Sequence, residues 1–241
     1  MGHGRPSGAT AGRGVVDGGS RWRKPGGSSR LRCLLVMACA CLAAGGNACR
    51  RGGEPARPQA APPGYMEEIQ AERQRKDLLF RTSLDSPLPE AAKASFKGLD
   101  YYPVDEAYRF EGKALLHQYP TRMTILGTMG ERRPAEKWAS FSFELAGRTE
   151  TLQIYRLLAE PNDPEGHPFI PFADGTSGVE TYPAGRYLDP VVDDQGNAVV
   201  DFNLAYNPYC AYGRPYDCPV PPPENRLKAP LRAGERGRAG P

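Results

Sequence analysis

Apolar and polar residues alternate with a period of two along much of the chain between residues 113 and 206. The clearest example has Phe141, Phe143 and Leu145 separated by polar residues, then Ala146-Gly147-Arg148-Thr149, then a return run with Leu152 and Ile154. Such alternation places one face of a strand in a core, and a short Gly-containing turn between two runs indicates a β-hairpin. We therefore predict a hairpin over residues 140–154.

A second alternating stretch runs from Tyr187 to Tyr206. It contains the turn Asp193-Asp194-Gln195-Gly196-Asn197 and predicts another hairpin, while weaker alternation predicts strands over residues 113–119 and 123–128. Short strands about ten residues apart, separated by turns and without helices between them, are typical of antiparallel folds. We predict a mainly β domain, either an antiparallel sandwich or a partly open barrel.

One segment before the strands, Tyr65–Phe80, has the pattern of a helix. Its acidic residues gather in the first half and its basic residues in the second, which suits the helix dipole. A thin apolar stripe is expected to dock on the domain, and it consists of Met66, Ile69, Leu79 and Phe80. We predict one N-terminal helix that caps an end of the sheet; a partner-binding helix is the alternative.

The first fifty residues have the composition of a targeting segment. Basic residues precede an apolar run of eleven residues, Leu34–Ala44, whereas a membrane-spanning helix needs about 20. A run of this length is typical of a secretory signal. The sequence Gly46-Asn47-Ala48-Cys49 resembles the end of a bacterial lipoprotein signal, so we predict that Cys49 is acylated and becomes the mature N-terminus. Cleavage near Ala48 without acylation and an uncleaved anchor are the alternatives; Cys39 fits the local pattern but has almost no apolar run before it.

These features divide the chain into four parts. Residues 1–49 form the leader, and residues 50–64, rich in Pro and Gly and without a large apolar side chain, are predicted to be a flexible spacer. Residues 65–235 are predicted to fold as a single domain, long enough to bury about 70% of its unfolded surface without needing disulfides. Residues 236–241 are predicted to be a disordered tail.

The net charge of +3 is unevenly distributed along the chain, and its distribution disfavours one class of function. Residues 1–50 carry +7, whereas the remaining 191 residues carry −4. A nucleic-acid-binding domain needs its positive charge in the folded part, so this class is disfavoured. The composition, 39% hydrophobic with 28 Gly and 25 Pro, also excludes a membrane bundle, a coiled coil and a collagen.

Cys210 and Cys218 enclose seven residues. In an exported chain a disulfide is the expected state, and closing so short a loop contributes about 2.5 kcal/mol. A metal pair completed by His117 or His167 is an alternative, although its spacing exceeds that of most zinc sites. Two free buried thiols are the third possibility. We predict the disulfide, no metal and no cofactor.

Four tyrosines crowd into eleven residues around these cysteines: Tyr206, Tyr209, Tyr212 and Tyr216. An amphipathic ring offers both a face and a hydroxyl. Tyr209, Tyr212 and Tyr216 are therefore candidates for a platform that stacks on a sugar or a peptidoglycan fragment. Packing of the rings beneath a Pro-rich loop is the plainer interpretation.

The polar turn Asp174-Gly175-Thr176-Ser177-Gly178 is the candidate for a catalytic or polar-ligand site. The side chains expected to converge there are Asp174, Ser177, Arg186, Asp201 and Asn203. The alternative is a turn whose side chains satisfy nearby backbone groups. The sequence has no nucleophile elbow, phosphate-binding loop, dinucleotide motif or paired-histidine zinc helix, so no catalytic residue is assigned.

Short motifs across the domain resemble those of the family catalogued as domain of unknown function 1684. The C-terminal block carries most of them: Phe172-Ala173-Asp174-Gly175-Thr176-Ser177-Gly178, Thr181-Tyr182, Gly185-Arg186-Tyr187-Leu188, Asp201-Phe202-Asn203, Ala205-Tyr206-Asn207-Pro208, Cys210-Ala211-Tyr212, Cys218-Pro219, Pro221-Pro222-Pro223-Glu224-Asn225 and Gly234-Glu235. Upstream, Arg75-Lys76-Asp77, Ser86-Pro87-Leu88 and Gly98-Leu99-Asp100-Tyr101-Tyr102-Pro103 agree with it. The resemblance spans about residues 66–235 and implies a prokaryotic family often found behind export or lipoprotein signals. It supplies no established activity.

We predict an exported, lipid-anchored protein of the cell membrane or outer membrane that faces the periplasm or the exterior. Its domain is expected to be a non-catalytic binding module for a small polar, glycan or protein ligand. The alternatives are an exported hydrolase that uses Asp174, Ser177 and Arg186, and a structural protein without a ligand. The membrane, reached through the lipid anchor, is the partner that the sequence indicates most directly.

Overall fold

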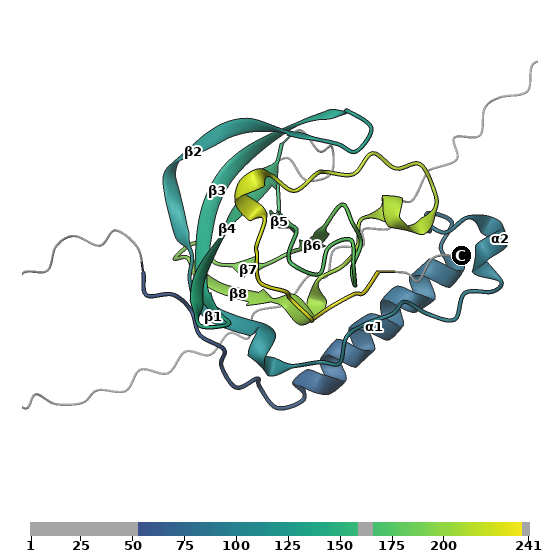
Figure 1. Cartoon of the computed structure of the whole chain (residues 1–241), viewed down its shortest axis with the longest axis horizontal. Helices are drawn as coiled ribbons and strands as arrows, with labels where there is room; N and C mark the ends of the chain where they lie inside the picture. Colours follow the sequence, from purple (N-terminus) through teal and green to yellow (C-terminus); the bar gives the residue numbers. More distant parts are fainter. Residues whose placement is uncertain (1–52, 159–165, 238–241) are drawn as a thin grey trace, which may run out of the picture. The chain divides into compact units, whose positions relative to one another are not determined.

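Two antiparallel sheets of unequal size carry most of the secondary structure (Figure 1). The computed structural model describes residues 53–158 and 166–237, which all belong to one unit spanning residues 47–241. The larger sheet has the strand order β2-β3-β4-β5-β6 and the smaller one β1-β8-β7. Both sheets are open, and the predicted mainly β, antiparallel fold is confirmed.

The larger sheet consists of β2 (Leu115–Leu126), β3 (Arg132–Leu145), β4 (Arg148–Leu157), β5 (Pro168–Phe172) and β6 (Arg186–Leu188). The smaller sheet consists of β1 (Arg109–Lys113), β7 (Val191–Val192) and β8 (Asn197–Asp201). The helices are α1 (Tyr65–Thr82), α2 (Glu90–Lys93) and the 3-10 turns η1 (Glu106–Tyr108), η2 (Phe202–Leu204), η3 (Tyr209–Tyr212) and η4 (Pro223–Asn225). Figure 1 shows β2, β3 and β4 as long curved strands with η4 inside the curve.

The β3–β4 hairpin forms as predicted because its turn and its alternation agree. Leu145 pairs with Arg148, which leaves Ala146 and Gly147 as the turn, with φ of 49° and 74°. Positive φ at both positions matches the twist of the flanking strands, and glycine adopts it without strain. The alternate apolar residues of both strands are buried on the same face.

The second predicted hairpin forms over a shorter length than expected. β7 and β8 pair around the Asp193 turn, with Val192 opposite Ala198. Beyond β8 the chain turns into η2 instead of continuing as a strand, because the Asp201 side chain accepts a hydrogen bond from the Asn203 amide and caps the turn. Tyr187 belongs to β6, which pairs with β5.

Some strands did not stand out from the alternation pattern. The two weak strands predicted over residues 113–119 and 123–128 are largely one strand, β2, whose register shifts between Leu116 and Thr121. β1 and β5 were not predicted, and β6 was predicted only as the start of the second hairpin and not as a separate strand. β5 and β6 are buried along almost their whole length, so they lack the polar alternation that marks a half-exposed strand.

Phe202 on η2 joins the two sheets. Its ring contacts Phe110 from β1, Phe143 from β3 and Phe172 from β5, with ring centroids 6.0, 5.4 and 5.5 Å away. All four rings are fully buried in the same core cluster. Aromatic contacts at these distances and angles add to the area that they bury.

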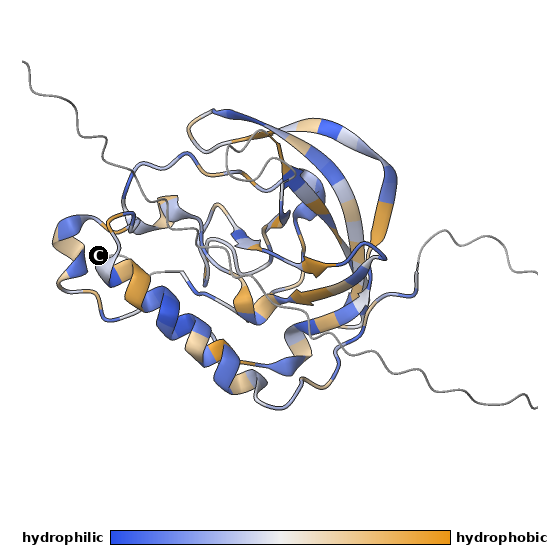
Figure 2. Ribbon diagram, turned by 180° about the vertical axis from the view of Figure 1, so that it is seen from behind, coloured by the Kyte–Doolittle hydropathy of each residue, from blue (hydrophilic) through white to orange (hydrophobic). Residues whose placement is uncertain are grey.

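Helix α1 forms where predicted and extends to Thr82. Tyr65, Ile69 and Phe80 are its buried residues, whereas Met66 and Leu79 of the predicted stripe are exposed. In Figure 2 the helix is mostly hydrophilic and becomes hydrophobic towards its C-terminal end. Polar contacts therefore hold much of α1: the Tyr65 hydroxyl donates to Asp201 at 2.7 Å, and Arg73 donates to the Tyr102 carbonyl at 3.0 Å.

The segment predicted as a flexible spacer is partly built into the domain. Ala56 is buried in the main core, its amide donates to the Ser142 carbonyl at 2.8 Å, and its carbonyl accepts from the Glu144 amide at 2.8 Å. The expectation that nothing in residues 50–64 joins the core was wrong for Ala56. A small side chain fits here because the Cβ of Ala56 lies against Gly112, where any side chain would collide with it.

Replacing Phe202 with Ala is expected to lower the free energy of unfolding by about 3–5 kcal/mol, because it opens a cavity between the two sheets. Urea denaturation of the full chain measures the change. Val179→Ala, at an exposed position, is the control and is expected to change stability by less than about 0.5 kcal/mol. Equal losses for the two variants would contradict the central role of Phe202.

Candidate functional site

Asp174 and Arg186 form a fully buried ion pair. The Arg186 guanidinium lies 2.8 Å from the Asp174 carboxylate, and both side chains have no exposed surface. Arg186 also donates to three backbone carbonyls of the C-terminal segment, those of Leu231, Ala233 and Glu235. The ion pair therefore ties β6 to the C-terminal segment.

The Asp174 carboxylate also accepts hydrogen bonds from its own loop and from the C-terminal segment. It accepts from the Thr176 amide and hydroxyl, at 2.8 and 2.7 Å, and from the Leu231 amide at 3.1 Å. The Ser177 hydroxyl accepts from the Asp174 amide at 3.1 Å. The structure thus brings Asp174, Ser177 and Arg186 together as a turn whose side chains hydrogen-bond to nearby backbone and to each other, as the alternative interpretation of the turn describes. The Arg186 Nε atom is buried without a hydrogen-bond partner.

Asp201 and Asn203 belong to a separate buried cluster with Tyr65 at the start of α1. Asp201 accepts from the Tyr65 hydroxyl at 2.7 Å, and the Asn203 amide group donates to the same hydroxyl at 2.9 Å and to the Asp105 carbonyl at 2.8 Å. Burial and the Asp201 carboxylate raise the pKa of Tyr65 well above its usual range. This cluster shares no hydrogen bond with the Asp174–Arg186 pair among the described residues.

The three candidate tyrosines differ in exposure. Tyr209 is 46% exposed, Tyr216 is half-buried and Tyr212 is buried. The Phe80 ring contacts two of them, with its centroid 4.7 Å from that of Tyr212 and 6.3 Å from that of Tyr209. Tyr209 and Tyr216 contact each other edge to face at 5.4 Å. Of the three, Tyr209 offers the most open surface, and Tyr212 faces inward.

The predicted disulfide between Cys210 and Cys218 is not formed in this structure, and both residues are free thiols. The Cys218 sulfur instead accepts a hydrogen bond from the Cys210 backbone amide at 3.3 Å, and the Cys210 sulfur accepts one from the Tyr182 hydroxyl at 3.7 Å. The two cysteines are therefore neighbours that interact without a covalent bond. Burial raises the pKa of Cys218 to about 12.

The histidines weighed as partners for these cysteines lie in other surroundings. His117 contacts the Lys137 carbonyl at 3.1 Å, and His167 lies 3.9 Å from the Asp189 carboxylate. Across residues 53–158 and 166–237, no group of three or more His, Cys, Asp and Glu side chains is arranged to hold a metal ion.

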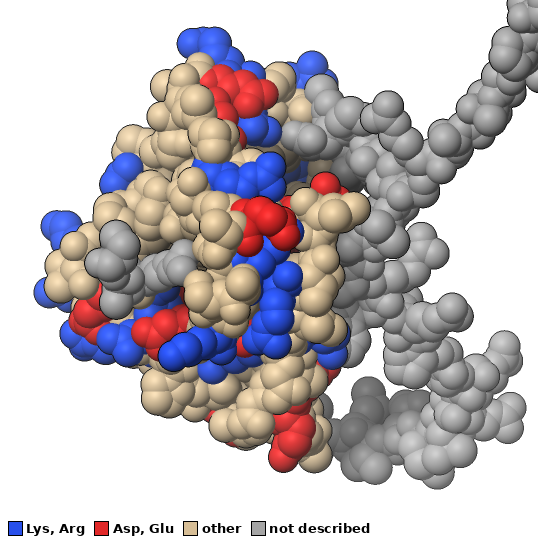
Figure 3. Space-filling view, turned by 90° about the vertical axis from the view of Figure 1, so that its right-hand side faces the viewer, with Lys and Arg blue, Asp and Glu red and all other residues tan. Residues whose placement is uncertain are grey.

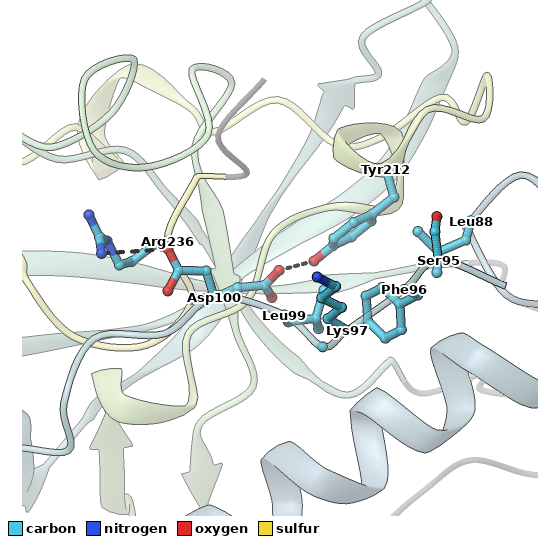
Figure 4. Close-up of a pocket in the computed structure, with 10 residues that line it drawn as sticks. Leu88, Ser95, Phe96, Lys97, Leu99, Asp100, Tyr212 and Arg236 are labelled. Carbon is cyan, nitrogen blue, oxygen red and sulfur yellow. Dashed lines mark hydrogen bonds and ion pairs between the residues drawn. The ribbon is translucent and has the colours of Figure 1, made fainter. Parts of the chain in front are cut away.

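A pocket of about 300 Å³ lies between the segment after α2 and the C-terminal segment (Figure 4). One wall is apolar and aromatic, and the opposite side and rim are charged. The lining residues are Leu88, Ser95, Phe96, Lys97, Gly98, Leu99, Asp100, Tyr212, Glu235 and Arg236. Concave sites that combine an apolar wall with a few polar groups are where small ligands usually bind.

Glu235 is the charged residue at the bottom of this pocket, and it is almost completely buried. It accepts from Lys76 at 2.8 Å, from the Tyr212 hydroxyl, and from the Asn207 amide and side chain at 3.2 and 3.1 Å. Four donors match the acceptor capacity of a carboxylate. Burial and the Glu235 charge raise the pKa of Tyr212, so its hydroxyl stays protonated and donates.

Helix α1 positions the opposite wall of the pocket through Asp77. The Asp77 carboxylate accepts from the Leu99 amide at 2.9 Å. Gly98 lies directly over this carboxylate with φ of 124°, and a Cβ at this position would come within 2.9 Å of an Asp77 oxygen. Only glycine allows the chain to pass this close to Asp77 with such a backbone conformation.

Most of this pocket was missed by the sequence analysis. Tyr212 is the one candidate binding residue that lines it, and none of the candidate catalytic residues does. The available signal was the segment Phe96-Lys97-Gly98-Leu99-Asp100, where aromatic, basic, glycine and acidic residues adjoin without a strand or helix pattern. Such a segment indicates a functional loop only once its tertiary neighbours are known.

Replacing Asp174 with Asn is expected to lower the free energy of unfolding by about 3–5 kcal/mol, because it leaves the Arg186 guanidinium buried without a counter-charge. The loss is measured by urea denaturation. Arg232→Gln disrupts the exposed pair with Glu180 and should leave the unfolding midpoint nearly unchanged. A midpoint equally unaffected in Asp174→Asn would contradict a structural role for the buried pair.

The Cys218 thiol is expected to be unreactive in the native protein. At pH 8 a pKa of about 12 leaves Cys218 with roughly 10³-fold less thiolate than an ordinary cysteine. Brief treatment with iodoacetamide followed by peptide mass mapping should show Cys218 unmodified in the native chain and modified after unfolding in guanidinium. A peptide pair linked through Cys210 and Cys218 would instead show that the disulfide forms.

Comparison with known proteins identifies the family of the chain but gives no activity. The family model described as "Protein of unknown function (DUF1684)" matches residues 94–236, which include every pocket-lining residue except Leu88. The solution NMR structure of an uncharacterized protein from gene locus rrnAC0354 of Haloarcula marismortui is 33% identical, with a TM-score of 0.57, over 73% of this chain and 96% of that one. No curated protein matches the chain. The chain therefore belongs to the family of proteins of unknown function named DUF1684.

Proposed function

We propose that this protein is an exported, lipid-anchored binding module that holds a small ligand without transforming it. The observation that carries the proposal is the pocket between Phe96, Leu99 and Tyr212, a concave surface where apolar and charged side chains meet. Its volume of about 300 Å³ lies at the lower end of the range for small-molecule sites and favours a small ligand over a protein segment.

The side chains that could support catalysis are engaged in the fold. Asp174 and Arg186 are buried together and are not in the pocket, and Asp201 is bonded to Tyr65 and Asn203. A general base needs a free lone pair within reach of a substrate proton. Glu235, the buried acid of the pocket, already accepts from four donors. This arrangement favours binding over the hydrolase alternative.

The export and anchoring part of the proposal rests on the leader sequence, which lies outside the described residues. The described residues contain no helix long and apolar enough to cross a membrane. Ala56 is already part of the core, so only six residues would separate acylated Cys49 from the core, and the two ends could be at most about 25 Å apart. The domain would then be held close to the lipid surface.

Intact mass measurement of the protein from a bacterial membrane fraction tests the anchor. We expect an N-terminus at Cys49 carrying acyl chains, because two or more chains give stable anchoring. Cys49→Ser should abolish acylation, whereas the control Cys39→Ser should retain it. Full-length, unacylated protein in the soluble fraction, or acylation that survives in Cys49→Ser, would contradict the proposal.

Titration with 1-hexanol, followed by protein NMR, tests the pocket as a binding site for small apolar groups. We expect saturable changes in the NMR chemical shifts of residues around Leu99 and Tyr212 only. Ser95→Trp fills the pocket mouth from an exposed lining position and should abolish the shifts. Thr121→Trp on exposed β2 is the matched control and should preserve them. Shifts that are absent in the native protein, or unchanged in Ser95→Trp, would refute the binding site.

A further inference from the structure

The acidic side chains that line the pocket have cationic partners, whereas one of its basic side chains has no acidic partner in the described part of the chain. Asp100 pairs with Arg236 at 3.5 Å, and Glu235 pairs with Lys76 at 2.8 Å. Both acids of the pocket therefore already have a cation. Lys97, the remaining charged lining residue, has no ion pair or hydrogen bond through its side chain among the described residues.

The surface charge around the pocket is mixed in sign. The face of the domain on the α2 side carries interspersed basic and acidic side chains (Figure 3). Exposed charges further apart than about 8 Å are largely screened at physiological salt. The Asp77 carboxylate lies behind the backbone of Gly98 and accepts from the Leu99 amide. Attraction of a charged ligand therefore depends on the side chains at the pocket mouth, and Lys97 is the one without a partner there.

The apolar wall lies beside this unpaired ammonium group. Phe80 stacks on Phe96 at 6.1 Å and contacts Tyr212 edge to face at 4.7 Å, so the wall is backed by a packed aromatic cluster. In Figure 4 the Lys97 side chain points towards the hydroxyl end of Tyr212, while Phe96 and Leu99 flank the same space. A ligand there meets an apolar surface and a positive charge together.

We propose that the ligand of this pocket is a small carboxylate with an apolar body. The carboxylate pairs with the Lys97 ammonium, and the apolar body packs against Phe96, Leu99 and Tyr212. One unpaired cation matches one negative charge, and the pocket volume favours a small apolar body. This proposal rests on the proposed function and adds the chemical class of the ligand.

The test compares three probes that share a six-carbon chain: hexanoate, 1-hexanol and hexylammonium. Dissociation constants come from protein NMR titrations of the full chain at low salt. We expect hexanoate to bind about fivefold more tightly than hexanol and hexylammonium to bind more weakly than hexanol, because the charge pair is partly exposed to solvent. The preference for hexanoate should shrink as salt is added.

Two single variants give opposite expected results for hexanoate. Lys97→Gln should weaken hexanoate about fivefold, and Asp100→Asn should tighten it, because this change frees Arg236 from its partner. Neither should change hexanol binding. Lys228→Gln removes an exposed cation outside the pocket and should leave all three constants unchanged.

The outcomes separate this proposal from the one on which it rests. Hexanol binding with no preference for hexanoate, or a preference that survives in Lys97→Gln, overturns the carboxylate assignment and leaves the pocket as a binding site. Tighter binding of hexylammonium than of hexanoate overturns it as well. If none of the three probes binds in the pocket, the proposed function itself fails.

Discussion

The buried guanidinium of Arg186 is the constraint on which the C-terminal third of the domain depends. A cation without exposed surface is stable only when charge and hydrogen bonds surround it, and here Asp174 and three carbonyls of the C-terminal segment do so. The chain between Leu231 and Glu235 must therefore pass where its carbonyls converge on β6. This requirement places Glu235 next to α1.

Glu235 extends the same network to the pocket. It connects Lys76 on α1 with Asn207 after η2 and Tyr212 on η3, so two regions more than a hundred residues apart in the sequence share one buried carboxylate. The pocket opens between these segments and the residues after α2. A site held by saturated polar contacts is rigid and pre-organised, which benefits binding more than a reaction that needs free acids and bases.

The structure also changes what the leader implies. Because Ala56 is in the core, a chain anchored at Cys49 has a short tether instead of a spacer that begins at residue 50 and ends at residue 64. The free thiols of Cys210 and Cys218 give no sign of an oxidising compartment, so the proposal of export rests on the signal sequence alone.

Local patterns in the sequence determined the mainly β class, helix α1 and the β3–β4 hairpin, because a period of two, a two-residue Gly turn and a charge gradient each act over a few residues. The same patterns did not show β5 and β6 as separate strands, because both are buried on both faces, or the role of Arg186 and Asp174, which looked like candidates for chemistry. Only the tertiary structure decided that these polar residues support the fold. It also decided that Lys97, Leu99, Tyr212 and Glu235 line one pocket, because contacts across more than a hundred residues depend on packing and not on local sequence.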